Sequence, residues 1–217
     1  MSRRIVLATK NPGKARELAE VLAALGVEII SLADLDPVDE PDECGETFAQ
    51  NARDKAMYYA RATGLWCLGD DSGLAVDALG GAPGVYSARY AAKLCPPDAP
   101  RDVLDQANNQ KLLADLADVP TEKRSARFIC HLALADGGKV LLEAAGTFEG
   151  QIGYEPAGAN GFGYDPLFFL PQKGCTSAQL SSEEKNAISH RGQAVRTFAE
   201  KLKKYLGIGN RQIGNRQ

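Results

Sequence analysis

RIVLATKNPGKARELAEVLAALGVEIIS, residues 4–31, is the stretch that decides the class of fold. Residues 4–9 form a short apolar run typical of a buried strand, and Asn11, followed by proline, gives the signature of a helix start. Leucine and valine then recur at helical spacing until Gly26, which is placed as a C-terminal cap, and residues 27–31 form a second apolar run. A strand, a helix and a strand in this order build parallel sheet, so the sequence predicts an α/β fold.

The middle of the chain adds a hairpin to this pattern. Residues 47–63 have helical periodicity, and residues 65–68 form an apolar strand that ends on Gly-Asp-Asp-Ser-Gly at 69–73. Residues 126–135 alternate apolar and polar side chains, and the Asp-Gly-Gly turn at 136–138 leads into another strand. Because a hairpin pairs its strands antiparallel, we expect the sheet to be mixed.

The remaining segments predict shorter elements. A helix with a polar face is expected at 103–116 and a short strand at 167–170. Ser181 and Glu184 form a capping box for a helix that contains Lys185, and one more helix follows it.

The length and composition allow one substantial core. The chain has 217 residues, of which 44% are hydrophobic and 24% charged. No linker divides residues 1–206, which we expect to form one domain. Residues 207–217, where Ile-Gly-Asn-Arg-Gln occurs twice, are expected to be a mobile polar tail.

Charge and cysteine usage exclude several classes of protein. A net charge of −3 argues against a protein that binds nucleic acid phosphates. The five cysteines include no C-x-x-C pair, which fits reduced thiols in a cytoplasmic protein better than a disulfide framework or a zinc site. Neither a secretory leader nor a run of ~18 apolar residues is present, so we expect no membrane partner.

The first group of candidate functional residues, from Thr9 to Lys14, lies between the first strand and the helix start. Free backbone N–H groups and the positive end of the helix dipole favour an anion there, and phosphate would suit the site. An ordinary capped helix with a solvated lysine is an equally good interpretation. The spacing of a Walker A loop is absent.

A pair of acids, Asp70 and Asp71, follows the apolar strand at 65–68, where α/β sheets present ligand-binding groups. Neighbouring residues in a strand point to opposite faces, so one acid is expected to face a metal or water and the other to support the backbone. A solvated turn is the alternative. Ser72 is not expected to be a nucleophile, because the G-x-S-x-G pattern is missing.

An acidic stretch at 34–46 precedes the helix at 47–63, and most of it is expected to be a solvated face with at most one or two ligands. Asn51 and Lys55 lie four residues apart on one face of that helix. They could reach phosphate if the helix borders a cleft, and otherwise Lys55 would be a surface lysine.

Aromatic rings separated by glycine occur at 161–166, on an expected loop. Phe162 and Tyr164 could stack against a base or plug the loop onto the core. The Ser-His-Arg-Gly segment at 189–192 supplies hydrogen-bond donors suited to a carbonyl oxygen or a phosphate. His131 lies within a predicted strand and is expected to be a sheet residue.

These segments, in this order, resemble the inosine triphosphate pyrophosphatase family, the non-canonical purine nucleoside triphosphate pyrophosphatases. The resemblance covers nearly the whole chain, from Leu7 to about Phe198. The segments that carry it are LATKNPGK at 7–14, Glu46-Thr47-Phe48 with Asn51 and Lys55, DDSGL at 70–74, GGAPGVYSAR at 80–89, GFGYDP at 161–166 and SHRGQA at 189–194. One departure is Cys44, where the family usually has Thr or Ser.

The resemblance implies a two-lobed α/β fold with a long twisted mixed β-sheet, flanking helices and a central substrate cleft. It also implies a homodimer and a requirement for Mg²⁺. Asp71 would be the general base and a metal ligand, with Glu43 as a second carboxylate near the metal and Ser72 in contact with substrate. The residues implied to hold the triphosphate are Thr9, Lys10, Asn11, Pro12, Gly13, Lys14 and Lys55. Those implied to hold the base are Phe162, Gly163, Tyr164, Asp165, Lys185, His190 and Arg191.

The implied reaction is hydrolysis of ITP, dITP and XTP to the monophosphate and pyrophosphate, which cleanses the nucleotide pool. Donors from His190 and Arg191 would match a 6-oxo group and oppose the amino group of adenine, at a cost of ~1 to 3 kcal/mol for an unmatched buried group. A pyrophosphatase for other modified nucleotides and a catalytically silent nucleotide sensor are the alternatives. An RNA-binding module fits less well.

Overall fold

The computed structural model describes residues 4–9, 15, 18–19, 22 and 26–208. Within them the chain forms a seven-stranded mixed sheet in the order β2-β1-β3-β4-β5-β6-β7. β1 pairs parallel with β2 and β3, and the other neighbours pair antiparallel, which confirms the predicted α/β fold with a mixed sheet. The strands are β1 (Arg4–Ala8), β2 (Glu28–Ser31), β3 (Trp66–Val76), β4 (Ser125–Asp136), β5 (Lys139–Ile152), β6 (Phe168–Leu170) and β7 (Cys175–Thr176).

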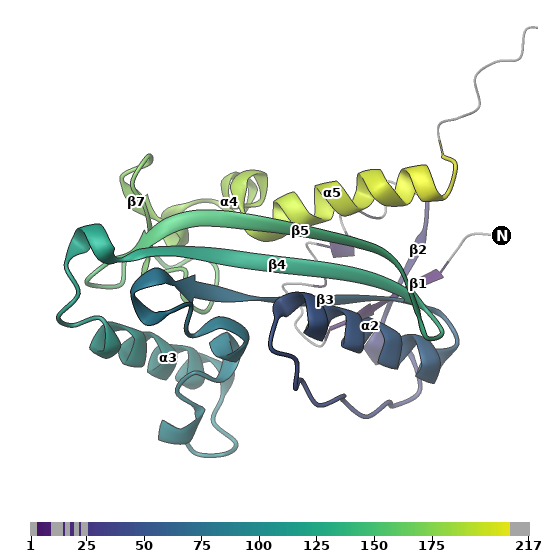
Figure 1. Ribbon diagram of the computed structural model, residues 1–217, viewed down its shortest axis with the longest axis horizontal. Coiled ribbons are helices and arrows are strands. Elements are labelled where there is room, and N and C mark those ends of the chain that lie inside the picture. Colours follow the sequence, from purple (N-terminus) through teal and green to yellow (C-terminus); the bar gives the residue numbers. More distant parts are fainter. Residues whose placement is uncertain (1–3, 10–14, 16–17, 20–21, 23–25, 209–217) are drawn as a thin grey trace, which may run out of the picture.

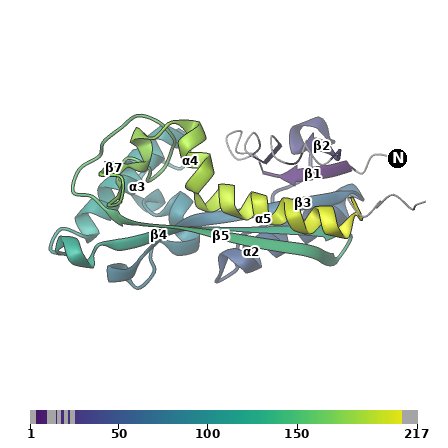
Figure 2. The same ribbon diagram turned by 90° about the horizontal axis from the view of Figure 1, so that it is seen from above.

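Helices cover both faces of this sheet. Figure 1 shows α5 above and α2 below the long strands β4 and β5. Figure 2 shows α3, α4 and β7 at one end of the molecule and β1 with β2 at the other. The bounds of these helices are α2 (Phe48–Thr63), α3 (Arg101–Asp115), α4 (Ser182–Ile188) and α5 (His190–Tyr205). Short 3-10 turns connect them at η1 (Leu32–Asp34), η2 (Asp77–Leu79), η3 (Gly84–Arg89), η4 (Ala92–Leu94), η5 (Thr121–Lys123) and η6 (Ser177–Gln179).

The predicted helix at 47–63 and the predicted helix that contains Lys185 are confirmed as α2 and α4. Thr47 caps the start of α2 through its side chain, and Gly64 ends the helix in the left-handed conformation. Ser181 and Glu184 form the capping box of α4. The helix predicted after β1 is helical at the residues that are described, which are Ala15, Leu18, Ala19 and Leu22. The predicted tail at 207–217 lies outside the described residues from 209 onward.

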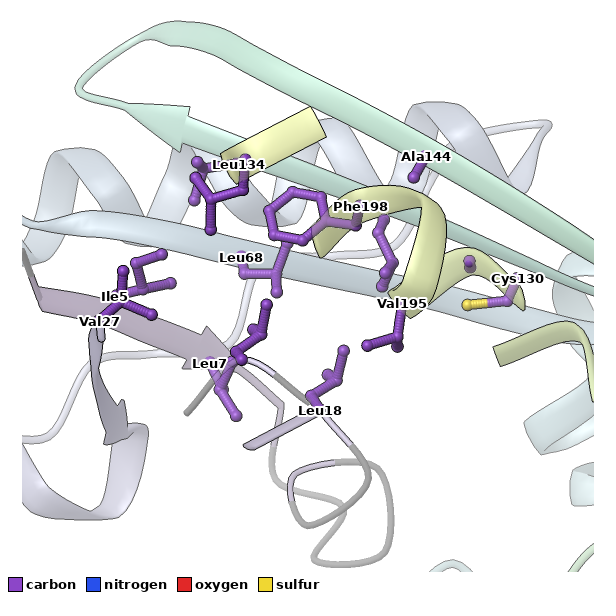
Figure 3. Packing of buried hydrophobic residues seen from close by; sticks show 14 residues of the cluster. Ile5, Leu7, Leu18, Val27, Leu68, Cys130, Leu134, Ala144, Val195 and Phe198 are labelled. Atoms are coloured by element: carbon purple, nitrogen blue, oxygen red, sulfur yellow. The ribbon is translucent and has the colours of Figure 1, made fainter. Parts of the chain in front are cut away.

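Alternate residues of β1 belong to different cores. Ile5 and Leu7 pack into a cluster beneath α5, and Figure 3 shows Phe198 and Val195 of that helix among the same side chains. Val6 and Ala8 pack with the apolar face of α2 on the other side of the sheet. Burial on both faces explains why this strand appears as a continuous apolar run in the sequence.

A third apolar cluster gives the molecule its second lobe. It lies under the distal half of β3 and β4 and includes Leu74, Phe128 and Phe168. Leu112 and Leu116 close it from α3, and both are fully buried. The two lobes therefore have separate cores that share the long strands.

The prediction that the strand at 65–68 ends on residues 69–73 is wrong. β3 continues to Val76, because β4 pairs with it from Cys67 through Val76 and gives its polar residues regular partners. β1, in contrast, pairs with β3 only as far as Gly69. The two acids thus lie in mid-strand, beside an edge that β1 leaves uncovered.

Two glycines let helices approach the sheet closely. A Cβ at Gly69 of β3 would overlap the backbone of α2 at Ala52 and Ala56. A Cβ at Gly146 of β5 would overlap the backbone of α5 at His190 and Ala194. Glycine is required at these positions for the space it leaves, since both lie in extended strands.

We predict that Gly69→Ala and Gly146→Ala each destabilise the protein by ~1–3 kcal/mol, because the added methyl group meets backbone atoms that cannot move separately from a helix. Urea denaturation measures this change. Gly138→Ala is the control, since its methyl group would meet the flexible end of Arg61. Equal stability of all three variants would contradict the packing.

Candidate functional site

Two adjoining hollows lie near the end of β1, and the smaller of them is lined by Asp70, Ser72 and Gly73 of β3. The smaller has a volume of about 340 Å³ and the larger about 560 Å³. Both are lined by Thr9, Glu40, Glu43 and Lys55. The predicted binding residues Lys10, Asn11, Pro12, Gly13 and Lys14 lie outside the described residues.

Lys55 projects from α2 into the region that the hollows share. Its ammonium group pairs with the carboxylate of Glu43 and donates to the backbone oxygen of Asp70 at 3.3 Å. Only 16% of its side chain is exposed, so Lys55 is not a surface lysine. It provides a cation at the wall of the cleft.

Asn51, one turn earlier on the same face of α2, joins two segments of the site. Its Oδ1 accepts from the backbone N–H of Gly45 at 2.8 Å, and its Nδ2 donates to Asp71 Oδ2 at 3.0 Å. Because a backbone N–H can only donate, these partners fix the orientation of the amide. Glu43 and Asp71 are therefore held one helical turn apart along α2, at Lys55 and Asn51.

The two adjacent acids face opposite sides of β3. Asp70 accepts from Arg191 Nε at 3.2 Å, from Cys130 Sγ at 3.5 Å and from the Ser72 hydroxyl at 3.2 Å. Arg191 also donates to Ser72 at 2.9 Å. Asp70 and Arg191 are 1% and 5% exposed, so this ion pair is buried rather than part of a solvated turn.

Asp71 lies behind the wall of the cleft. Its side chain faces α2, it is 7% exposed, and it is absent from the described linings of both hollows. Asp70 and Ser72 line the smaller hollow instead. His131, directly opposite Asp71 in β4, lines neither hollow, and burial lowers its pKa, which agrees with a neutral sheet residue.

The two rings of the aromatic loop, residues 161–166, have different surroundings, and each matches one of the two interpretations. Phe162 is 39% exposed and lines the smaller hollow, with its ring centre 5.4 Å from Lys185 Nζ and 6.0 Å from Arg191 Cζ. Tyr164 is 4% exposed and donates its hydroxyl to the backbone oxygen of Ser87 at 2.9 Å. Burial raises the pKa of Tyr164 far above its ordinary value, so it stays a donor that anchors the loop.

Asp165 holds the aromatic loop from within. Its carboxylate accepts from the Phe162 backbone N–H at 2.8 Å and from the Ser177 hydroxyl at 3.0 Å, and it pairs with the ammonium of Lys185. Asp165 is 2% exposed. These partners indicate that it positions Phe162 and Lys185.

His190 and Arg191 form the first turn of α5, with Ser189 as N-cap. The His190 ring stacks on Phe128 with centres 4.9 Å apart and an interplanar angle of 14°. Both rings line the smaller hollow. The structure thus brings Thr9, Glu43, Lys55, Ser72, Phe162, Gly163, Tyr164, Asp165, Lys185, His190 and Arg191 together around the cleft.

Arg89 of η3 and two residues of α3, Arg101 and Asp105, line the site although no role there was predicted for them. Arg89 pairs with Glu43 at 3.5 Å and lines the larger hollow. Arg101 and Asp105 line the smaller one and pair with each other at 3.0 Å. Opposite charges four residues apart predict such a pair on a helix, but not which way the helix faces.

The fold and the site together define an α/β protein whose cleft has an exposed ring and hydrogen-bond donors in one lobe and a lysine beside carboxylates in the other. The sequence model of the Ham1 family matches residues 5–201, and the chain belongs to this family. This finding agrees with the resemblance carried by the motifs.

Curated relatives and solved structures support the assignment. The chain is 50% identical over 202 residues to the dITP/XTP pyrophosphatase of Shigella flexneri, covering 92% of this chain and 98% of the relative. It is 52% identical over 198 residues to that of Nitratidesulfovibrio vulgaris, covering 90% and 94%. The HAM1 protein structure from Coxiella burnetii superposes with a TM-score of 0.83 at 42% identity, covering 93% of this chain and 99% of that one.

We predict that Asp70→Asn destabilises the protein by about 3–5 kcal/mol, because it leaves the guanidinium of Arg191 buried without its counter-charge. Denaturant titration measures the change. Asp77→Asn is the matched control, since Asp77 pairs with Arg127 at the surface and its loss should cost less than ~1 kcal/mol. Similar losses in both variants would contradict a buried pair.

Proposed function

We propose that this chain hydrolyses ITP, dITP and XTP to the monophosphate and pyrophosphate. The observation that carries the proposal is the cleft itself, where Phe162 and Lys185 border one end and Lys55 borders the other. A base needs a ring surface with hydrogen-bond donors, and a polyphosphate needs cations. The relatives named dITP/XTP pyrophosphatase support the same substrates.

We further propose Mg²⁺ as the cofactor, held by Glu43 and Asp71. Carboxylate oxygens are ligands that suit this ion, which typically uses one or two of them together with water and substrate phosphates. Among the described residues, no group of three or more His, Cys, Asp or Glu side chains is placed to hold a metal ion. When bound, the ion would neutralise phosphate charge and make the α-phosphorus easier to attack.

The side chains around Lys55 would rearrange on binding. Lys55 pairs with Glu43, and a phosphate oxygen would compete for the same ammonium group. This transfer would free the carboxylate of Glu43, which is held one helical turn along α2 from Asp71. Asp71 faces α2 behind the wall of the cleft, so it would have to turn toward the hollow to orient the attacking water and accept its proton, after which pyrophosphate would leave.

The other lobe would select the base. Lys185, His190 and Arg191 present donors around the exposed ring of Phe162. A 6-oxo group accepts such hydrogen bonds, whereas the amino group of adenine would meet them donor to donor. The mismatch disfavours ATP.

We also propose that the protein is a cytoplasmic homodimer that binds neither nucleic acid nor membrane. Its cysteines are free in the structure, as expected in a reducing compartment. No helix in the described part of the chain combines the length and apolar character needed to cross a membrane. The resemblance supports the dimer, and exposed Tyr86 and Leu94 provide apolar surface.

Incubation with ITP and Mg²⁺ should release pyrophosphate and IMP in equal amounts, with ATP turned over far more slowly. Ion chromatography of the products tests this expectation. Release of orthophosphate alone would exclude the reaction. Activity confined to other modified nucleotides would support a different pyrophosphatase, and tight ITP binding without turnover would support a sensor.

Asp71→Asn should lower kcat by roughly 10² to 10⁴, because the amide cannot accept a proton from water. The fold should survive, since the Oδ1 of the new asparagine can still accept from Asn51. Steady-state kinetics and the melting temperature measure the two effects. Near-normal kcat in the folded variant would remove Asp71 from the mechanism.

A further inference from the structure

Helix α3 holds the backbone of the aromatic loop through two side chains one turn apart. Asp105 Oδ2 accepts from the Gly163 backbone N–H at 3.2 Å. Asn109 Nδ2 donates to the Gly163 backbone oxygen at 3.0 Å. Both polar groups of a single loop residue are therefore bound to one face of one helix.

Gly163 is a position where the loop needs external support. It adopts φ +63°, in the left-handed region, and it separates the exposed ring of Phe162 from the buried ring of Tyr164. The Phe162 backbone N–H is already held by Asp165 at 2.8 Å. The hydrogen bonds from α3 hold the loop on the other side of Phe162, so the ring lies between two fixed points.

α3 is itself fixed by contacts that do not involve the loop. Asn108 is 2% exposed, accepts from the Ala91 backbone N–H at 2.7 Å and donates to the Ser87 backbone oxygen at 3.4 Å. Leu112 and Leu116 are buried in the core of the second lobe. The helix can therefore act as a rigid frame for the loop.

Arg101 extends this arrangement to the rim of the cleft. Its Nε pairs with Asp105 Oδ1 at 3.0 Å, which orients the carboxylate toward Gly163. Both side chains line the smaller hollow beside Phe162 and Gly163. The support is thus part of the wall that a base would meet.

We propose that Asp105 and Asn109 are positioning residues that set base selectivity by fixing Gly163, and through it the ring of Phe162 opposite the donors of α4 and α5. The inference rests on the proposed function and deepens it. A displaced ring would no longer hold the 6-oxo group against those donors, so selectivity would fall together with affinity.

The test is steady-state kinetics of Asn109→Ala, Asp105→Ala and the double variant, with ITP and ATP and Mg²⁺. Each single change should raise KM for ITP by roughly threefold to tenfold, the effect of one hydrogen bond, while kcat stays within about twofold. The ratio of kcat/KM for ITP over ATP should fall by a similar factor. The double variant should lose less than the product of the two, because both groups hold the same residue.

Two further variants separate positioning from general damage. Asp105→Asn keeps an oxygen that can accept from Gly163, and it should restore most of the selectivity that Asp105→Ala loses. Gln110→Ala changes an exposed neighbour on the same helix and should leave KM and selectivity unchanged. Melting temperatures are measured for every variant.

If the ratio of kcat/KM for ITP over ATP is unchanged in the double variant, the proposal is overturned, whether or not stability or kcat falls. Such a result would mean that the two residues support the fold without affecting selectivity. Failure of Asp105→Asn to recover selectivity would also overturn the proposal. The wild-type protein serves as the separate check on the proposed function. If it releases no pyrophosphate from ITP, that function fails, and calorimetric binding of IMP to the same variants decides the role of α3 independently.

Discussion

The site depends on the difference in length between two neighbouring strands. β1 pairs with β3 as far as Gly69, and β3 continues to Val76 along β4. Beyond the last shared residue, one edge of β3 is available to groups other than a strand. Lys55 donates to that edge at Asp70, and Ser87 binds it at Leu74. A cleft at this point follows from the sheet topology, as it does where neighbouring strands of other α/β sheets diverge.

Charges can be buried at this edge because each has a partner from another element. Asp70 in β3 is matched by Arg191 in α5, and Asp165 is matched by Lys185 in α4. Unpaired, any of these groups would cost far more than a surface charge. The pairs also explain why helices α4 and α5 meet at the cleft, since the N-terminal turn of α5 must reach the middle of β3.

Much of the fold could be predicted from the sequence because local patterns specify it. The apolar run of β1, the helix at 47–63 and the turn at 136–138 can each be predicted from residues within a few positions of one another. The end of β3 was misplaced for a physical reason. Polar residues at 70–72 have the composition of a turn, and only the partner strand β4, distant in sequence, keeps them extended.

The sequence predicts most of the residues that form the site, but not how their side chains are arranged in space. The motifs named most of the side chains that line the cleft, but alternation along β3 could not decide which acid faces it. Asp70 contacts the side of α5 and Asp71 the side of α2, and that choice is made by the packing of Gly69 against α2. Residues on α3 carry no motif at all, because their role arises from contacts with Gly163.

The same arrangement explains how one cleft can treat two ends of a nucleotide differently. The end of the cleft near Lys55 depends on charges that can exchange partners, because Lys55 pairs with Glu43 and a phosphate could take the place of Glu43. The end near Phe162 depends on fixed geometry, with the loop held by Asp165 inside and α3 outside. Binding of a polyphosphate depends more on neutralisation of its charge than on a close fit to its shape. Discrimination between an oxo and an amino group instead requires hydrogen-bond donors and a ring in fixed positions. Neutralisation of the phosphates is placed on α2 and selection of the base between α3 and α4, so each lobe meets its own requirement while the long strands join them.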